Sequence, residues 1–187
     1  MIDRRAARFL PSVVLAAALA FGATGCGGDG GSGKDSSSST SASDAQKAKS
    51  ALDAGLKAHA SGDLTTAAAD YNRTLKYDGT NKFAFYNLAL IDEASKNYGL
   101  AEEHYRAALD ADPKYEPALF NLAILRTSRD PKEAVSLYRR AVAANKKDAS
   151  AWLNLGLLLR ASGDKQEGDR AVAHAIELNP DLTDPEK

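Results

Sequence analysis

The chain has 187 residues, of which 44% are hydrophobic and 26% are charged, and its formal net charge is −1. This balance is typical of a globular protein, and the lack of a basic excess argues against a nucleic-acid partner. Cys26 is the only cysteine, so an intramolecular disulfide is excluded.

The first 25 residues have the organisation of a signal peptide. Three arginines near the start precede an apolar stretch from Phe9 to Phe21, which is the order of charge and hydrophobicity in a secretory signal. The stretch is shorter than the roughly 20 residues that a transmembrane helix needs. We therefore interpret residues 1–25 as a signal peptide.

The end of this segment, Ala23-Thr24-Gly25-Cys26, resembles a bacterial lipobox, in which small residues precede an invariant cysteine. The resemblance implies that a diacylglycerol is attached to the Cys26 sulfur and that cleavage makes Cys26 the mature N-terminus. Each buried acyl methylene contributes about 0.8 kcal/mol, so we expect a stable lipid anchor at the extracytoplasmic face of a bacterial cell membrane. The alternative is an ordinary secretory peptide in which Cys26 is incidental.

Residues 26–44 form a linker in which Gly and Ser dominate. Twelve of the eighteen residues from 27 to 44 are Gly or Ser. Such a composition buries too little apolar surface to offset the entropy of ordering, so we expect a disordered tether. Gly28–Lys34 has the glycine and lysine spacing of a phosphate-binding loop, but Asp35 stands where that loop needs Ser or Thr. No nucleotide site is expected there.

Residues 45–182 form the predicted folded domain, because an internal period runs from residue 48 onward. The repeats are 48–81, 82–115, 116–148 and 149–182, and residues 183–187 are a short tail. Apolar residues three and four apart predict two helices in each repeat. Small residues at the eighth and twentieth positions predict that the two helices approach closely; they are Gly55, Ala89, Ala123 and Gly156, and Ala67, Ala101, Ala134 and Gly168.

These columns resemble the tetratricopeptide repeat pattern, which has Trp, Leu-Gly and Tyr in the first helix, Ala, Phe and Ala in the second, and Pro after it. The second repeat matches best, with Phe85, Leu88, Ala89, Ala101, Tyr105, Ala108 and Pro113. The resemblance implies an all-α fold, an α-solenoid of about four helical hairpins that stack because a single hairpin cannot cover its own apolar face.

The resemblance also implies that the first helices of the repeats line a concave groove for a partner polypeptide. An asparagine recurs there at the sixth position, as Asn87, Asn121 and Asn154. An amide offers both a donor and an acceptor, so this column is predicted to grip the backbone of an extended peptide, or else reflects ancestry alone. The apolar residues predicted to line the same groove are Tyr86, Phe120, Leu90, Ile124 and Leu157.

The sequence therefore predicts a lipid-anchored scaffold that binds a protein or peptide partner. Two alternatives are a structural, self-associating envelope protein and an accessory subunit of an envelope biosynthetic enzyme. None of the three histidines, His59, His104 and His174, has a second ligand at metal spacing. We expect no catalytic residues, no cofactor, no metal and no small-molecule substrate.

Overall fold

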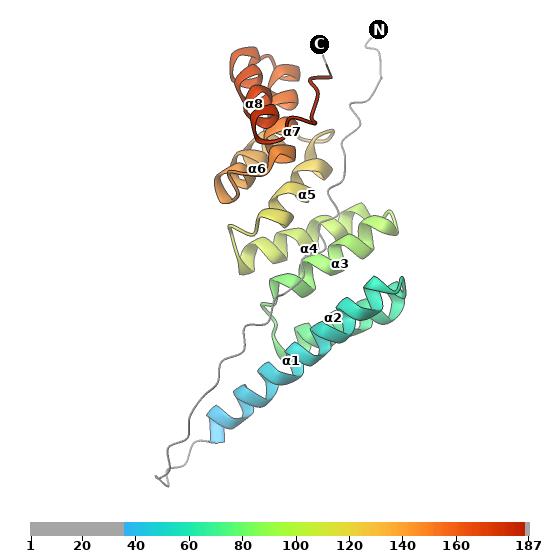
Figure 1. Ribbon diagram of the computed structural model, residues 1–187. Helices are drawn as coiled ribbons and strands as arrows, with labels where there is room; N and C mark the ends of the chain where they lie inside the picture. The colour runs from blue at the N-terminus through green and yellow to red at the C-terminus, as the bar shows by residue number, and fades with distance from the viewer. Residues whose placement is uncertain (1–35, 186–187) are drawn as a thin grey trace.

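The computed structural model describes residues 36–185, and every regular element in that range is an α-helix. The helices are α1 (Ser36–Ala60), α2 (Leu64–Tyr77), α3 (Lys82–Ala94), α4 (Tyr98–Ala111), α5 (Glu116–Arg126), α6 (Pro131–Ala144), α7 (Ala149–Ala161) and α8 (Lys165–Leu178). They pair as antiparallel hairpins that stack in chain order into an elongated array (Figure 1). The predicted all-α solenoid is confirmed.

Side chains in the sequence itself set where the helices begin. The helices α3, α5 and α7 start at residues 82, 116 and 149, which are the first residues of the predicted second, third and fourth repeats. A side-chain oxygen accepts a hydrogen bond from a free backbone N–H at the start of four helices. The capping residues are Asp63, Asn81, Asp130 and Asp148.

The turn inside a hairpin needs a left-handed residue in three of the four repeats. Gly62 and Gly163 have φ angles of 82° and 100°, and Lys96 has a φ of 62° at the equivalent position. Glycine adopts this conformation without steric cost, whereas Lys96 does not. The third repeat is one residue shorter at this turn, and Pro131 begins its second helix directly.

The core is a band of side chains that runs along the stack. The second helices contribute Tyr71, Tyr105 and Tyr138, all fully buried. The small residues Ala67, Ala101 and Ala134 are also fully buried, and a Cβ atom added to Gly55 would lie only 2.7 Å from the Tyr71 ring. The predicted close approach of the paired helices is therefore confirmed.

The first helix is longer than the sequence suggested. Residues 36–44 were expected to belong to a disordered tether, but α1 begins at Ser36, and its N-terminal part runs past the end of α2 (Figure 1). No Gly or Pro lies between residues 34 and 54. Extending an existing helix costs far less than nucleating one, so the helix of the first repeat continues outward through the serines.

The signal peptide, the lipid site at Cys26 and most of the linker lie outside the described residues. Within residues 36–185, none of the helices combines the length and the apolar character that crossing a bilayer requires.

Candidate functional site

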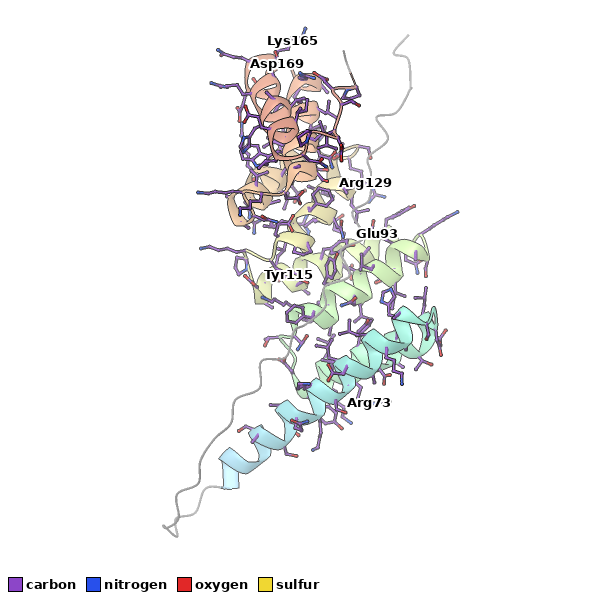
Figure 2. The ribbon with its side chains drawn as sticks, in the orientation of Figure 1. Arg73, Glu93, Tyr115, Arg129, Lys165 and Asp169 are labelled. Atoms are coloured by element: carbon purple, nitrogen blue, oxygen red, sulfur yellow. The ribbon has the colours of Figure 1, made fainter. Side chains whose placement is uncertain are left out.

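The candidate site is the face formed by α1, α3, α5 and α7, which we call the first-helix face. It carries the residues predicted to line the groove, and the structure divides them into buried and partly exposed groups. Glu93 at the end of α3 and Tyr115 just before α5 lie toward opposite edges of the stack (Figure 2).

Two predicted lining residues, Tyr86 and Phe120, belong instead to the core. They are only 2% and 3% exposed. The Tyr86 ring packs edge-on against Tyr115, with ring centroids 5.4 Å apart, and Phe120 packs edge-on against Tyr138 at 5.9 Å. The expectation that these rings lie open to a guest is wrong, because Tyr86 is packed against the start of the next hairpin and Phe120 against the second helix of its own hairpin.

The asparagine column is also buried. Asn87, Asn121 and Asn154 are between 6% and 8% exposed. The Asn87 amide donates to the Phe83 carbonyl at 2.8 Å, within its own helix, and the Asn121 amide donates to the Tyr86 hydroxyl of the preceding repeat at 3.2 Å. Each of these two amides therefore donates a hydrogen bond inside the protein, whereas the sequence predicted that the column grips the backbone of a peptide.

Asn121 also serves a buried tyrosine, because its amide bonds to the Tyr86 hydroxyl. The Tyr138 hydroxyl, by contrast, has no hydrogen-bond partner among the described residues, and burial raises the pKa of Tyr138 to about 12. A buried hydroxyl without a partner costs about 1–3 kcal/mol. Asn121 therefore has a structural role between repeats, which a single sequence could not separate from a ligand role.

A row of aliphatic side chains does stay partly exposed on this face. The row occupies the ninth position of each repeat and consists of Leu56, Leu90, Ile124 and Leu157. The first three pack with one side against the buried core. We call this set the aliphatic row. It contains three of the residues predicted from the sequence, Leu90, Ile124 and Leu157.

A polar row lies beside the aliphatic row, because residues three apart are neighbours on a helix. It occupies the twelfth position and consists of His59, Glu93, Thr127 and Arg160. In the first two repeats this residue meets the buried tyrosine of its own hairpin. The His59 Nδ1 lies 3.2 Å from the Tyr71 hydroxyl, and the Tyr105 hydroxyl donates to the Glu93 carboxylate. Burial lowers the pKa of His59 and raises that of Glu93.

The fourth repeat breaks this pattern. Val172 replaces the tyrosine and has no polar atom to offer Arg160. The Arg160 Nε donates to the Asp169 carboxylate at 2.7 Å, and its two Nη atoms donate to the two Asp184 oxygens at 2.8 and 3.0 Å. The side chains of Arg160 and Asp184 are only 8% and 4% exposed. Asp184 belongs to the segment after α8, which turns back beside α7 (Figure 1).

Sequence reasoning missed a second charged feature, between the third and fourth repeats. Glu116 at the start of α5 lies beside Asp148, whose carboxylate caps α7 through Ser150 and Ala151. Burial, together with the Asp148 carboxylate, raises the pKa of Glu116 to about 8. The two residues are 32 positions apart, and no local motif marks them as a pair.

The remaining histidines lie beside acidic side chains. Across residues 36–185, no group of three or more His, Cys, Asp or Glu side chains is arranged to hold a metal ion. His104 lies 2.7 Å from the Asp92 carboxylate and His174 lies 3.2 Å from that of Glu177. Both histidines stand on second helices, away from the aliphatic row.

Comparison with known proteins identifies the repeat. The tetratricopeptide repeat model matches residues 46–116 and 124–179, which is more than half of the chain. A photosystem I assembly protein of Synechococcus elongatus is 35% identical over 74 residues, covering 38% of this chain and 43% of that protein. The counterpart in Cyanophora paradoxa is 36% identical over 76 residues, with the same coverage. The chain therefore spans less than half the length of these curated relatives.

Solved structures agree in fold. A crystal structure of MamA superposes with a TM-score of 0.64 at 23% identity, covering 73% of this chain and 75% of that one. The pilF protein of Pseudomonas aeruginosa superposes with a TM-score of 0.64 at 20% identity, covering 75% of this chain and 64% of that one. At these identities the likeness extends to the stacked hairpins and no further.

Proposed function

The chain belongs to the tetratricopeptide repeat family, and from that premise we propose that it is a lipid-anchored scaffold that holds an extended segment of a partner protein on its first-helix face. The scaffold role follows from the fold, which presents one repeated surface along a stack of hairpins. The peptide-binding mode, the anchor and the location are the further parts of the proposal.

The aliphatic row is the observation that carries the binding mode. Leu56, Leu90, Ile124 and Leu157 hold the same position in successive repeats and remain partly exposed. Only a minor part of each side chain is still exposed, so covering it contributes about 0.5 kcal/mol, and four add about 2 kcal/mol. A micromolar complex needs about 8 kcal/mol. The remainder is assigned to the polar row, which lies within reach of the same guest segment.

This version of the site differs from the predicted grip of the asparagine column on a peptide backbone. The amide donors of Asn87 and Asn121 serve the protein itself, so the guest is recognised through the ninth and twelfth positions of each repeat. Tyr86 and Phe120 support the face from beneath. A partner segment then contacts aliphatic side chains in one strip and polar side chains in the next.

Attachment to the extracytoplasmic face of a bacterial membrane is supported by the sequence around Cys26. Small residues precede this single cysteine, and a Gly- and Ser-rich stretch follows it. The helix α1 begins ten residues after Cys26. The segment of α1 before Ala48, the first buried residue from position 41 onward, spans about 18 Å. This segment would hold the repeats away from a membrane surface.

Site-specific photocrosslinking in intact cells tests the binding face. A photoreactive residue is placed at Leu90, Ile124 or Leu157, and the matched controls carry it at Glu103 or Lys132, which are exposed on second helices. We expect the three first-helix positions to capture one common protein that the controls do not capture. Equal capture from both sets of positions, or none from the first set, would show that the face is not the binding surface.

The same experiment separates the alternatives. Capture of a second copy of this chain would support a self-associating structural role. Capture of an enzyme would support a role as an accessory subunit. The relatives named as assembly proteins make a third outcome of interest, namely capture of a subunit of a larger complex.

A further inference from the structure

The segment after α8 is held on the molecule by specific bonds. The Leu182 amide donates to the Asn179 carbonyl at 3.1 Å, and the Asp181 amide donates to the Asn179 side-chain oxygen at 3.1 Å. These bonds turn the chain directly after the helix. The turn carries Asp184 back to Arg160, which is 24 residues away in sequence.

The bond between Arg160 and Asp184 has the form that recognises a carboxylate. Each Nη atom of Arg160 donates a hydrogen bond to a different oxygen of the Asp184 carboxylate. Such a planar, two-bond contact is more selective for a carboxylate than a single hydrogen bond. Both side chains are almost wholly buried. A buried pair is tolerated only where each charge is well matched, so this position is built around a carboxylate.

Three residues of the fourth repeat combine to build the position. Val172 replaces the tyrosine found in the other repeats. Gly168 replaces alanine, and a Cβ atom there would lie 2.7 Å from the Arg160 Cγ and 2.9 Å from its backbone nitrogen. The Asp169 carboxylate accepts a hydrogen bond from the Arg160 Nε. The Arg160 side chain therefore packs against Gly168 and is oriented by the Asp169 carboxylate. Its two Nη atoms bind the Asp184 carboxylate of the tail.

The position lies at the end of the surface proposed to bind a partner. Arg160 is the only arginine or lysine of the polar row, and Leu157 of the aliphatic row precedes it by one turn of α7. A guest segment that follows the aliphatic row therefore reaches Arg160, where the protein's own tail lies.

We propose that Arg160 is a recognition point for an acidic polypeptide segment and that residues 180–185 are its built-in occupant, which a partner must displace. This inference rests on the proposed function and adds to it the chemistry of the partner, a segment with an Asp or Glu side chain. A tethered occupant acts at an effective concentration in the millimolar range. It therefore weakens the binding of any competing segment.

Binding of the tail sequence in trans tests the inference. The probe is a fluorescein-labelled synthetic peptide that copies residues 179–187, and its binding to the full-length chain is followed by fluorescence anisotropy. The Asp184→Asn variant releases the tail. We expect it to bind the peptide at least about tenfold more tightly than the parent chain, because the competing occupant is lost.

Four controls make the test specific. Asp181→Asn removes the same charge from an exposed position of the tail and should leave peptide binding at the parental level. Adding Arg160→Gln to the Asp184→Asn chain should abolish binding, whereas adding Arg139→Gln, at an exposed arginine, should not. A peptide with Asn in place of Asp184 should not bind. If Arg160→Gln fails to fold by circular dichroism, Arg160→Lys, which keeps the charge but loses the fork, should weaken binding.

Equal binding by the parent and the Asp184→Asn chain, no binding by that variant, or unchanged binding without the Arg160 fork would each overturn the inference. The assay contains no cellular partner. Its failure therefore leaves the scaffold proposal intact, and failure of the crosslinking experiment leaves the peptide result standing.

Discussion

Gly156 and Gly168 face each other where α7 and α8 make contact. A Cβ atom added to Gly156 would lie 2.8 Å from the Gly168 carbonyl oxygen, and one added to Gly168 would lie 2.7 Å from the Gly156 carbonyl oxygen. Both distances are shorter than real Cβ contacts. The backbones of the last hairpin can therefore come this close only because neither residue has a side chain.

Alanine at Gly156 is expected to lower the free energy of unfolding. Forcing an extra methyl group into a close contact typically costs 1–3 kcal/mol, which exceeds the gain of about 1 kcal/mol in helix propensity. Urea denaturation followed by circular dichroism measures the change. Gly99 in α4 is the matched control, because a Cβ atom there meets nothing within 4 Å, and Gly99→Ala should be neutral or slightly stabilising. A Gly156→Ala protein as stable as the control would contradict the tight contact.

The contact between Asn121 and Tyr86 predicts coupling between two repeats. Tyr86→Phe and Asn121→Ala should each reduce stability by about 1 kcal/mol, since each removes a hydrogen bond at a buried site. The double variant should lose less than the sum of the two, because the residues share one bond. Chemical denaturation of the four proteins completes the cycle. Strictly additive losses would mean that the amide contributes independently of the hydroxyl.

Glu116 predicts a decline of stability with rising pH. Its pKa is raised from 4.5 to about 8 by burial and by the Asp148 carboxylate, so between these pH values the folded protein binds more protons than the unfolded chain. The stabilising effect of the proton is complete below about pH 4.5 and is lost as pH rises through about 8. One pKa unit corresponds to about 1.4 kcal/mol, so even part of the shift is measurable.

Glu116→Gln is the variant that isolates this effect. It keeps the shape of the side chain and removes the charge that Asp148 opposes. We expect the melting temperature of the variant to exceed that of the parent at pH 9 and the two values to converge toward pH 5. Parallel melting temperatures across this range would locate the pH dependence in another group.

The Cys26 prediction concerns localisation. Cys26→Ser removes the acceptor of the proposed lipid, so the variant should move from the membrane fraction to the soluble fraction, or accumulate uncleaved. Fractionation of cells and metabolic labelling with a fatty acid measure the two effects. A parent protein that is already soluble, or that incorporates no fatty acid, would remove the anchor from the proposal.

The repeat pattern predicted most of the fold because it depends on neighbours close in sequence. The period of 33 or 34 residues gave the starting points of α3, α5 and α7, and the small residues identified the close approaches. The prediction for the start of α1 failed, because it was based on the Gly- and Ser-rich composition of the linker, which suggested disorder. Helix continuation depends on what already anchors the helix, which composition does not record.

The site was predicted less completely. Leu90, Ile124 and Leu157 do remain partly exposed, whereas Tyr86 and Phe120 are buried in the core. A periodic pattern indicates which residues share one face of a helix. It does not show how much of that face the next hairpin hides, because this depends on how far the hairpins turn as they stack.

The amino-acid sequence alone determined the helical hairpins, their number in residues 48–182 and the glycine and alanine contacts that join them, since these follow from local periodicity and side-chain size. Only the tertiary structure decided that Asn121 bonds to Tyr86, that Glu116 lies beside Asp148 and that Asp184 returns to Arg160. These pairs are 24 to 35 residues apart. Whether these residues come into contact depends on the angle at which the hairpins stack and on the path of the chain after α8. Both are set by the tertiary packing and not by the local sequence.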